Sequence, residues 1–151
     1  MILAALFLAQ AVASGPDCGK AVGIIAQDQC RLAESLKVRR VDCETQRTQS
    51  EMNICSYRDF LRADIAMNQA WSRAAGFAKR GGTEVLGDPK EHGRLLVAQR
   101  AWITFRDAHC AATTGPREIG GSMWPLMRNG CLTELTQERT KQLREYVEPN
   151  N

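Results

Sequence analysis

The sequence lacks the features that mark metal proteins, β-proteins and membrane proteins. It has two histidines, no HExxH motif and no CxxC pair, and neither histidine stands at ligand spacing from a cysteine, which argues against a metal site. Beyond residue 13, no apolar run approaches the roughly 20 residues of a transmembrane helix. No strand-like alternation extends beyond a few residues. These absences predict an all-α protein with no metal, no cofactor and no membrane span.

The sequence also has little excess of charge of either sign. The chain carries 20 Lys and Arg against 17 Asp and Glu, a formal net charge of +3, and the two signs are interspersed. Nucleic-acid binding needs Lys and Arg clustered on one face, whereas the longest basic run, residues 37–40, fits the end of a helix. We therefore expect a protein partner and no nucleic acid.

Three segments resemble catalytic motifs only in part. Residues 120–124 have Trp where the nucleophile motif GxSxG has its last Gly, and no strand precedes them. Residues 82–87 have the glycine spacing of a phosphate loop, but Asp88 replaces the required Lys. His109 lies on an apolar stripe beside Cys110, which favours a packed histidine over a general base. The chain is predicted not to be an enzyme.

The first thirteen residues predict an export signal. They are uncharged and mostly apolar, and they end in Ala11-Val12-Ala13, a small-x-small cleavage site, although the usual positively charged first segment is missing. The apolar part is too short to span about 30 Å of hydrocarbon. We expect cleavage after Ala13 and a mature protein that works in the periplasm or outside the cell.

The six cysteines predict a disulfide framework, because an even number in an exported chain is typical of one. Six cysteines allow 15 pairings. Their order along the chain favours three local pairs: Cys18–Cys30, Cys43–Cys55 and Cys110–Cys131. Each would contribute about 2–4 kcal/mol, mainly by restricting the unfolded chain.

Four segments have the apolar spacing of amphipathic helices: residues 20–36, 48–80, 88–113 and 124–147. The second begins with a capping box, in which Thr48 precedes Glu51 by three residues, and Gly81 follows its end. Gly130 is expected to perturb the last. Amphipathic helices bury their stripes against one another, so the sequence predicts a small antiparallel helical bundle stapled by disulfides.

Two of these helices have apolar faces that the spacing assigns to the core. The face of the first holds Val22, Ile25, Ala26, Cys30 and Ala33. The third starts at the capping residue Asp88, with Pro89 at its first position. Its face holds Leu95, Ala98, Trp102, Phe105 and His109. Residues 81–87 and 115–122 are expected to be loops.

Several polar residues flank the apolar stripes instead of lying opposite them: Asp64, Asn68, Gln99, Arg106, Asp107, Thr136 and Arg139. Asp64 and Asn68 are one helical turn apart and share a face. We interpret the group as a half-buried hydrogen-bond network that fixes the register of the helices. A ligand site between helices is the alternative, and the balance of cations and carboxylates disfavours it.

The segment between the third and fourth helices is the candidate binding element. If Cys110 pairs with Cys131, the segment is a closed loop of about twenty residues, and such a loop loses little entropy on docking. Trp124 either anchors a partner or caps the core. The candidate contacts are Arg117, Glu118, Gly120, Gly121, Ser122 and Trp124.

From Cys43 onward the chain resembles the LprI-type, lysozyme-inhibitor-like domain of small exported bacterial proteins. The residues that carry the resemblance occur in order over about 100 positions. They are Cys43, Thr48-Gln49, Glu51-Met52-Asn53, Cys55, Asp64, Met67-Asn68, Trp71, Gln99, Trp102, Phe105-Arg106-Asp107, Cys110, Gly120-Gly121-Ser122, Cys131, Thr136, Arg139 and Leu143.

The resemblance implies an exported helical domain with local disulfides over residues 43–148, and it leaves residues 14–42 as an added helical arm. It makes inhibition of a lysozyme, a peptidoglycan hydrolase, a named hypothesis, because one family member inhibits lysozyme. The alternative is a non-catalytic adaptor or structural module in the cell envelope. Common lysozymes are basic, as this chain is, so inhibition would depend on a local fit and not on long-range attraction.

Overall fold

The computed structural model describes residues 17–38, 40–81 and 90–149, and all regular structure in these residues is helical. The elements are η1 (Cys18–Lys20), α1 (Ile24–Val38), α2 (Gln49–Lys79), α3 (Glu91–Thr114), α4 (Arg117–Gly120), η2 (Gly121–Met123) and α5 (Trp124–Val147). The all-α prediction is confirmed. The predicted export signal, nearly all of the first predicted loop and the capping residue Asp88 lie outside the described residues.

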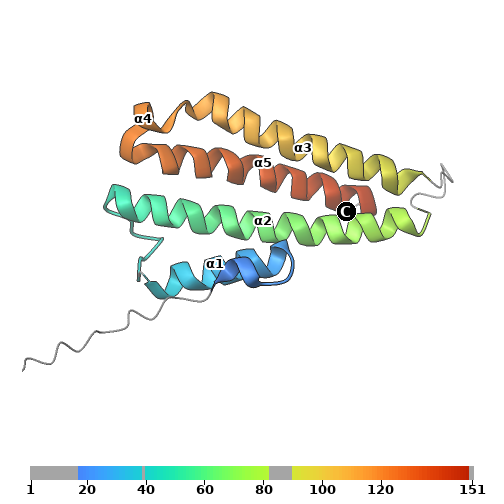
Figure 1. Cartoon of the computed structure of the whole chain (residues 1–151), viewed down its shortest axis with the longest axis horizontal. Coiled ribbons are helices and arrows are strands. Elements are labelled where there is room, and N and C mark those ends of the chain that lie inside the picture. Colours follow the sequence, from blue (N-terminus) through green and yellow to red (C-terminus); the bar gives the residue numbers. More distant parts are fainter. Residues whose placement is uncertain (1–16, 39, 82–89, 150–151) are drawn as a thin grey trace, which may run out of the picture.

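The helix α2 lies at the centre of the molecule (Figure 1). It has α1 on one side and α5 on the other, and α3 packs against both α5 and α2. Successive long helices run antiparallel, as predicted, so that α2 and α5 run in the same direction. The short elements α4 and η2 connect α3 to α5 at one end of the bundle.

The start and end of α2 follow from local signals in the sequence. The Thr48 hydroxyl accepts a hydrogen bond from the backbone N–H of Glu51 at 3.2 Å, and the Glu51 carboxylate accepts one from the N–H of Thr48 at 2.9 Å. This is the predicted capping box. The helix stops before Gly81, whose φ of +110° would strain any other residue.

The hydrophobic core lies between α2 and α5, toward the C-terminal ends of both helices. Its buried members are Met67, Ala70, Ala74 and Leu143, and α3 covers it with Leu95 and Trp102. The two alanines have no side chain beyond Cβ, so the helix axes can approach closely. None of the described helices is long and apolar enough to cross a membrane.

The predicted core face of α3 is wrong in part. Ala98, Phe105 and His109 are exposed, and the His109 ring lies 5.4 Å from the Phe105 ring at the surface instead of packing in the core. The buried residues of α3 are Glu91, Gln99, Arg106 and Cys110. The apolar spacing failed because α3 faces the bundle mainly with polar side chains.

Three smaller predictions are also corrected. Residues 21–23 are not helical, so that Val22 is 95% exposed, and Ala33 is exposed as well. The segment after α3 is not irregular, because it contains α4 and η2. The helix α5 continues through Gly130, since one glycine costs a helix only about 1 kcal/mol.

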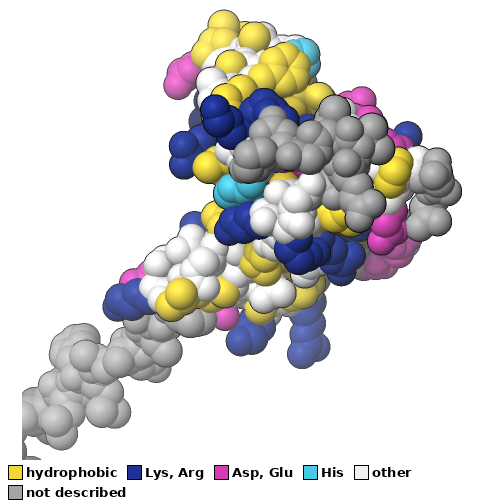
Figure 2. Space-filling view, turned by 90° about the vertical axis from the view of Figure 1, so that its right-hand side faces the viewer, with side chains coloured by type: hydrophobic (Ala, Val, Ile, Leu, Met, Phe, Trp, Pro, Cys, Tyr) yellow, Lys and Arg dark blue, Asp and Glu magenta, His cyan; other side chains and the backbone are white. Residues whose placement is uncertain are grey.

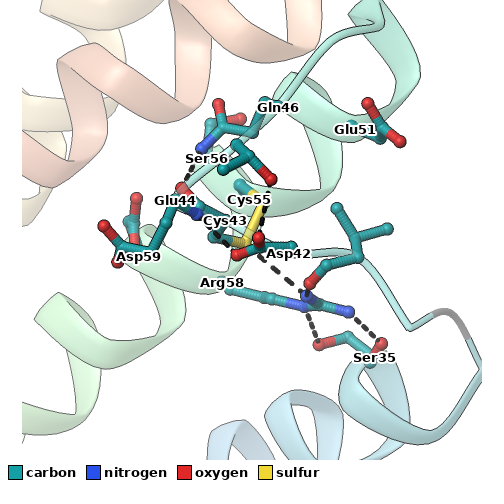
Figure 3. The surroundings of a disulfide bond; sticks show 12 residues. Ser35, Asp42, Cys43, Glu44, Gln46, Glu51, Cys55, Ser56, Arg58 and Asp59 are labelled. Carbon is teal, nitrogen blue, oxygen red and sulfur yellow. Dashed lines mark hydrogen bonds between the residues drawn. A yellow bond between two sulfur atoms is a disulfide. The ribbon is translucent and has the colours of Figure 1, made fainter.

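The structure forms the three local disulfides that the chain order favours, with Cα–Cα distances of 5.5 to 5.7 Å. The Cys43–Cys55 bond holds the segment after α1 against α2, and Arg58 of α2 extends this attachment (Figure 3). The Arg58 side chain is fully buried, and it donates to the carbonyl oxygens of Ser35 at 2.6 Å and Val41 at 3.1 Å. Arg58 therefore fixes the C-terminal end of α1 against α2, an attachment that the sequence analysis missed.

Candidate functional site

The candidate site is the tip, defined here as residues 115–124, which includes α4 and η2. Just below it, the Cys110–Cys131 disulfide joins α3 to α5. Cys110 has no exposed surface, whereas Cys131 is partly exposed. Gly115 ends α3 with φ +64°, a conformation that residues other than glycine rarely adopt. The chain can therefore turn sharply out of α3 into the tip.

Trp124 supports the tip from the inside. Its indole N–H donates to the carbonyl oxygen of Gly115 at 2.9 Å, and the Arg128 guanidinium lies 5.4 Å from its ring. Gly120 packs directly on this side chain, because a Cβ atom at residue 120 would lie 2.9 Å from the Trp124 Cβ. Trp124 is half-buried, and its polar atom is engaged within the tip.

The tip is also attached to the beginning of α2. The Asn53 side-chain amide donates to the carbonyl oxygen of Ser122 at 2.8 Å, and Gln49 donates to Asn53 at 2.9 Å. About one turn after Asn53 on α2, the Ser56 hydroxyl accepts a hydrogen bond from Asn129 of α5 at 3.1 Å. These hydrogen bonds join segments 69 and 73 residues apart in sequence. The tip is therefore held in one conformation by the bundle.

The outer surface of the tip combines apolar and charged side chains. Ile119 is 84% exposed, and Met123 and Met127, spaced four and eight residues from it, are 51% and 41% exposed. Arg117 and Glu118 are exposed beside Ile119. The two charged residues were predicted contacts, whereas Ile119, Met123 and, just beyond the tip on α5, Met127 were not. Their spacing of four residues could have predicted a shared apolar surface. It was not used because the segment was predicted to be an irregular loop.

Residues of the predicted polar network are hydrogen-bonded to one another across the bundle. Arg106 donates to Asp64 at 3.0 Å, to Thr136 at 3.3 Å and to Asp107 at 2.9 Å. The Asn68 amide donates to the second carboxylate oxygen of Asp64 at 2.8 Å. These bonds join α2, α3 and α5 through one buried guanidinium, whose neighbours leave it little room to move.

A second part of the network lies closer to the apolar core. Arg139 donates to the side-chain oxygen of Gln99 at 2.9 Å, and Gln99 donates to the Met67 sulfur at 3.1 Å. The Trp102 ring lies between the two arginines, with Arg106 at 5.3 Å and Arg139 at 5.9 Å from its centre. All seven predicted members therefore belong to one set of contacts between α2, α3 and α5.

Asp28 extends this network into α1. It is 4% exposed, and Arg31 donates to it at 2.9 Å. Burial, followed by a hydrogen bond with Asp64 and repulsion from that carboxylate, raises the pKa of Asp28 to about 6. The sequence analysis missed Asp28, although its spacing of three and four residues from Ile25 and Leu32 places it on the face of α1 that packs on α2.

No group of three or more His, Cys, Asp or Glu side chains in the described ranges is placed to hold a metal ion. A groove of about 690 Å³ runs between α2 and α5, with alanines and threonines along its base and charges of both signs at its edges. It contains none of the predicted site residues.

The family model described as lysozyme inhibitor LprI matches residues 42–143. This protein belongs to the LprI family. An uncharacterized protein of Rhizobium meliloti (strain 1021) is 38% identical to it over 112 residues, which cover 71% of this chain and 79% of that protein. No solved structure matches the chain.

The matched range locates the LprI features on the structure. It begins just before the Cys43–Cys55 disulfide and includes α2, α3, the tip and nearly all of α5. The polar network from Asp64 to Arg139 lies inside it as well. The arm that contains α1 and the Cys18–Cys30 disulfide lies outside it.

Proposed function

We propose that this LprI protein is an exported, non-catalytic inhibitor that binds a lysozyme-type peptidoglycan hydrolase through its tip. The family supplies the class of partner, because it is described as a lysozyme inhibitor family. The observation that supports the contact surface is the tip itself. It is braced by the Cys110–Cys131 disulfide at its base, by the bond from Trp124 to Gly115 and by the bond from Asn53 of α2 to Ser122, and it still exposes 84% of Ile119.

A braced tip suits inhibition for a thermodynamic reason. Ordering a flexible loop on binding costs free energy that a loop already held in one conformation does not lose again. The bonds from Trp124 to Gly115 and from Asn53 to Ser122 provide that order before the partner arrives. The apolar side chains outside these bonds are then free to be buried in a partner.

Lysozyme-type enzymes bind a glycan chain in an open cleft, and a convex tip is the shape that fills a cleft. Ile119 would lie deepest, since it is the most exposed apolar side chain of the tip. The Glu118 carboxylate and the Ser122 hydroxyl, both on exposed residues, would take the place of sugar hydroxyls as hydrogen-bonding groups. The net charge of +3 gives no long-range attraction to a basic enzyme, so specificity comes from these short-range contacts.

The first test is a lysis assay with the oxidised protein from Ser14 onward. The protein is titrated into a suspension of bacterial cells with each of several lysozyme types, and the fall in turbidity is followed. We expect lysis by at least one type to decrease in proportion to added protein and to stop near an equimolar ratio. If no lysozyme type is inhibited, the proposed function is wrong.

The second test locates the contact surface. Ile119→Asp places a charge at the centre of the tip, and Glu118→Ala removes the neighbouring carboxylate. We expect Ile119→Asp to raise the half-inhibitory concentration at least tenfold, since burying one such side chain contributes about 2 kcal/mol. Val22→Asp is the matched control, because Val22 is an equally exposed apolar residue on the arm. Equal inhibition by the parent and both tip variants would show that the tip is the wrong surface.

The alternative function, an envelope adaptor that holds another protein by a helix face, is favoured by one observation. The outer face of α3 exposes Val97 at 66%, Phe105 at 54% and Ile103 at 38%. Exposed apolar side chains on a helix are typical of a contact surface. Val97 and Phe105, eight residues apart, share one side of α3, whereas Ile103 lies on another. Substitutions at these three residues would affect an adaptor, whereas substitutions in the tip would affect an inhibitor.

A further inference from the structure

The outer face of α3 is apolar over most of its length. Figure 2, which looks along the length of the bundle, shows hydrophobic side chains at the top of the molecule, where α3 and α4 lie in Figure 1. Between residues 101 and 112 the only Lys, Arg, Asp or Glu side chains are Arg106, which is buried, and Asp107. The exposed residues there include Ile103, Phe105 and four alanines. Exposed apolar surface of this kind is typical of a face that contacts another protein.

The exposed residues of this face repeat in the pattern that pairs helices. Their spacing alternates between four and three residues, which is the spacing of the contact positions in a two-helix coiled coil. Phe105 flanks this stripe on one side with more than half of its surface exposed. The stripe, called the α3 stripe below, consists of Val97, Ala101, Thr104, Ala108 and Ala111.

Two opposite charges lie on the other side of the α3 stripe. Arg100 and Asp107 are exposed and seven residues apart, so they occupy equivalent positions in successive repeats. Within the described part of the chain, the Arg100 side chain takes part in no ion pair. Asp107 binds Arg106 at 2.9 Å and keeps half of its side-chain surface exposed.

We propose that the α3 stripe is the contact between two copies of this chain, packed antiparallel with Arg100 of each copy beside Asp107 of the other. The charges favour the antiparallel arrangement. A parallel pair would place the charged edge of one helix against the Phe105 edge of the other, whereas the antiparallel pair brings the two charged edges together and forms two equivalent ion pairs across a twofold axis. The alanines let the two helix axes approach closely, and the two Phe105 side chains cover the opposite edge.

The proposed dimer leaves the tip accessible. The tip follows the C-terminal end of α3, and an antiparallel pair places the two C-terminal ends about 36 Å apart, the length of a 24-residue helix. The two tips then point in opposite directions. The contact involves one helix from each copy, so we expect a weak dimer with a dissociation constant in the micromolar range. This inference does not depend on the proposed inhibition.

The test uses sedimentation equilibrium of the oxidised protein between about 5 and 500 μM, a range that spans micromolar dissociation constants. We expect the parent to change from monomer to dimer within this range. Arg100→Asp and Asp107→Arg should each weaken self-association at least tenfold, because each places like charges opposite each other. An equimolar mixture of the two variants should regain parental affinity, because the mixed dimer has both ion pairs, with their signs exchanged in one case.

Two further variants distinguish a specific contact through the α3 stripe from a general effect of changed charge on self-association. Ala108→Glu introduces a carboxylate in the middle of the stripe and should abolish the dimer. Arg62→Asp is the matched control, because Arg62 is a half-exposed arginine on α2 that pairs with Asp59, and it should leave self-association unchanged.

A parent protein that stays monomeric at 500 μM would overturn the proposal. So would a dimer that Ala108→Glu and Arg100→Asp leave intact, or an apolar partner protein that occupies the stripe while the parent alone stays monomeric. The lysis assay of Arg100→Asp should match the parent, so the two proposals fail separately.

Discussion

At the scale of single residues, a few buried charged side chains link the helices of the bundle to one another. Arg58 binds the end of α1, Arg106 joins three helices, and Asp28 brings α1 into the same network. Removing one partner from such a group leaves the other buried without compensation. We therefore expect single substitutions here to affect stability more than substitutions at exposed apolar residues.

Asp28 gives a pH-dependent prediction. Its pKa is about 6 in the folded protein, against an ordinary value of 3.8, so the folded state keeps a proton that the unfolded state releases between pH 4 and 6. This proton favours the folded state at pH 4, and its contribution is lost as the pH rises to 6, by at most about 3 kcal/mol. Asp28→Asn has no proton to lose. We expect the variant to be more stable than the parent at pH 7.5, and the difference to shrink toward pH 4.

Urea unfolding of the two proteins at intervals between pH 4 and 7.5 measures this difference. The other titrating groups are present in both proteins, so their contributions largely cancel in the difference curve. Arg31 of α1 and Asp64 of α2 lie next to Asp28, and Arg106 of α3 donates a hydrogen bond to Asp64. A constant difference over the whole range would show that Asp28 does not titrate between pH 4 and 6.

At the scale of helices, the sequence predicted the limits of elements better than their faces. The capping box and Gly81 fixed α2 within one residue, because these signals act through neighbouring backbone groups. The buried face of α3 was assigned wrongly, because an apolar stripe normally faces the core and here polar side chains do. Which side of α3 faces α2 depends on partners far away in sequence, such as Asp64 and Thr136.

Two glycines in different elements should respond in opposite ways to the same substitution. Gly121 has φ +53°, so Gly121→Ala would strain the tip by roughly 1–3 kcal/mol. Gly130 is exposed in the middle of α5, and a Cβ atom added there would meet no neighbouring side chain within 4 Å, so Gly130→Ala should stabilise the protein by about 1 kcal/mol. Thermal unfolding followed by circular dichroism measures both. If Gly121→Ala were as stable as the parent, the tip would not be held as rigidly as its bonds indicate.

At the scale of the whole molecule, the fold class and the disulfides were predictable and the surface of the site was not. The cysteine order and the helical spacing act locally, and the structure follows both. The exposure of Ile119 depends on how α4 leaves the bundle, which is decided by Trp124, Gly115 and Asn53 together. No pattern in the tip segment alone reveals that three-part support.

The three disulfides brace different parts of the molecule. Cys18–Cys30 closes only the arm, Cys43–Cys55 ties the segment after α1 to α2, and Cys110–Cys131 joins α3 and α5 below the tip. In the chain-entropy account each stabilises the fold by about 3 kcal/mol. Double serine variants of each pair should therefore lose similar stability in global unfolding, to the extent that the arm unfolds together with the bundle.

Function should separate the three variants where stability does not. Because only Cys110–Cys131 adjoins the tip, its serine variant should inhibit lysozyme at least tenfold less well at a temperature where all three variants remain folded. The Cys18–Cys30 variant should inhibit as the parent does, since the arm lies outside the matched LprI range. If the arm variant lost inhibition and the tip variant kept it, the contact with the hydrolase would have to include α1, and the tip would serve only to connect α3 to α5.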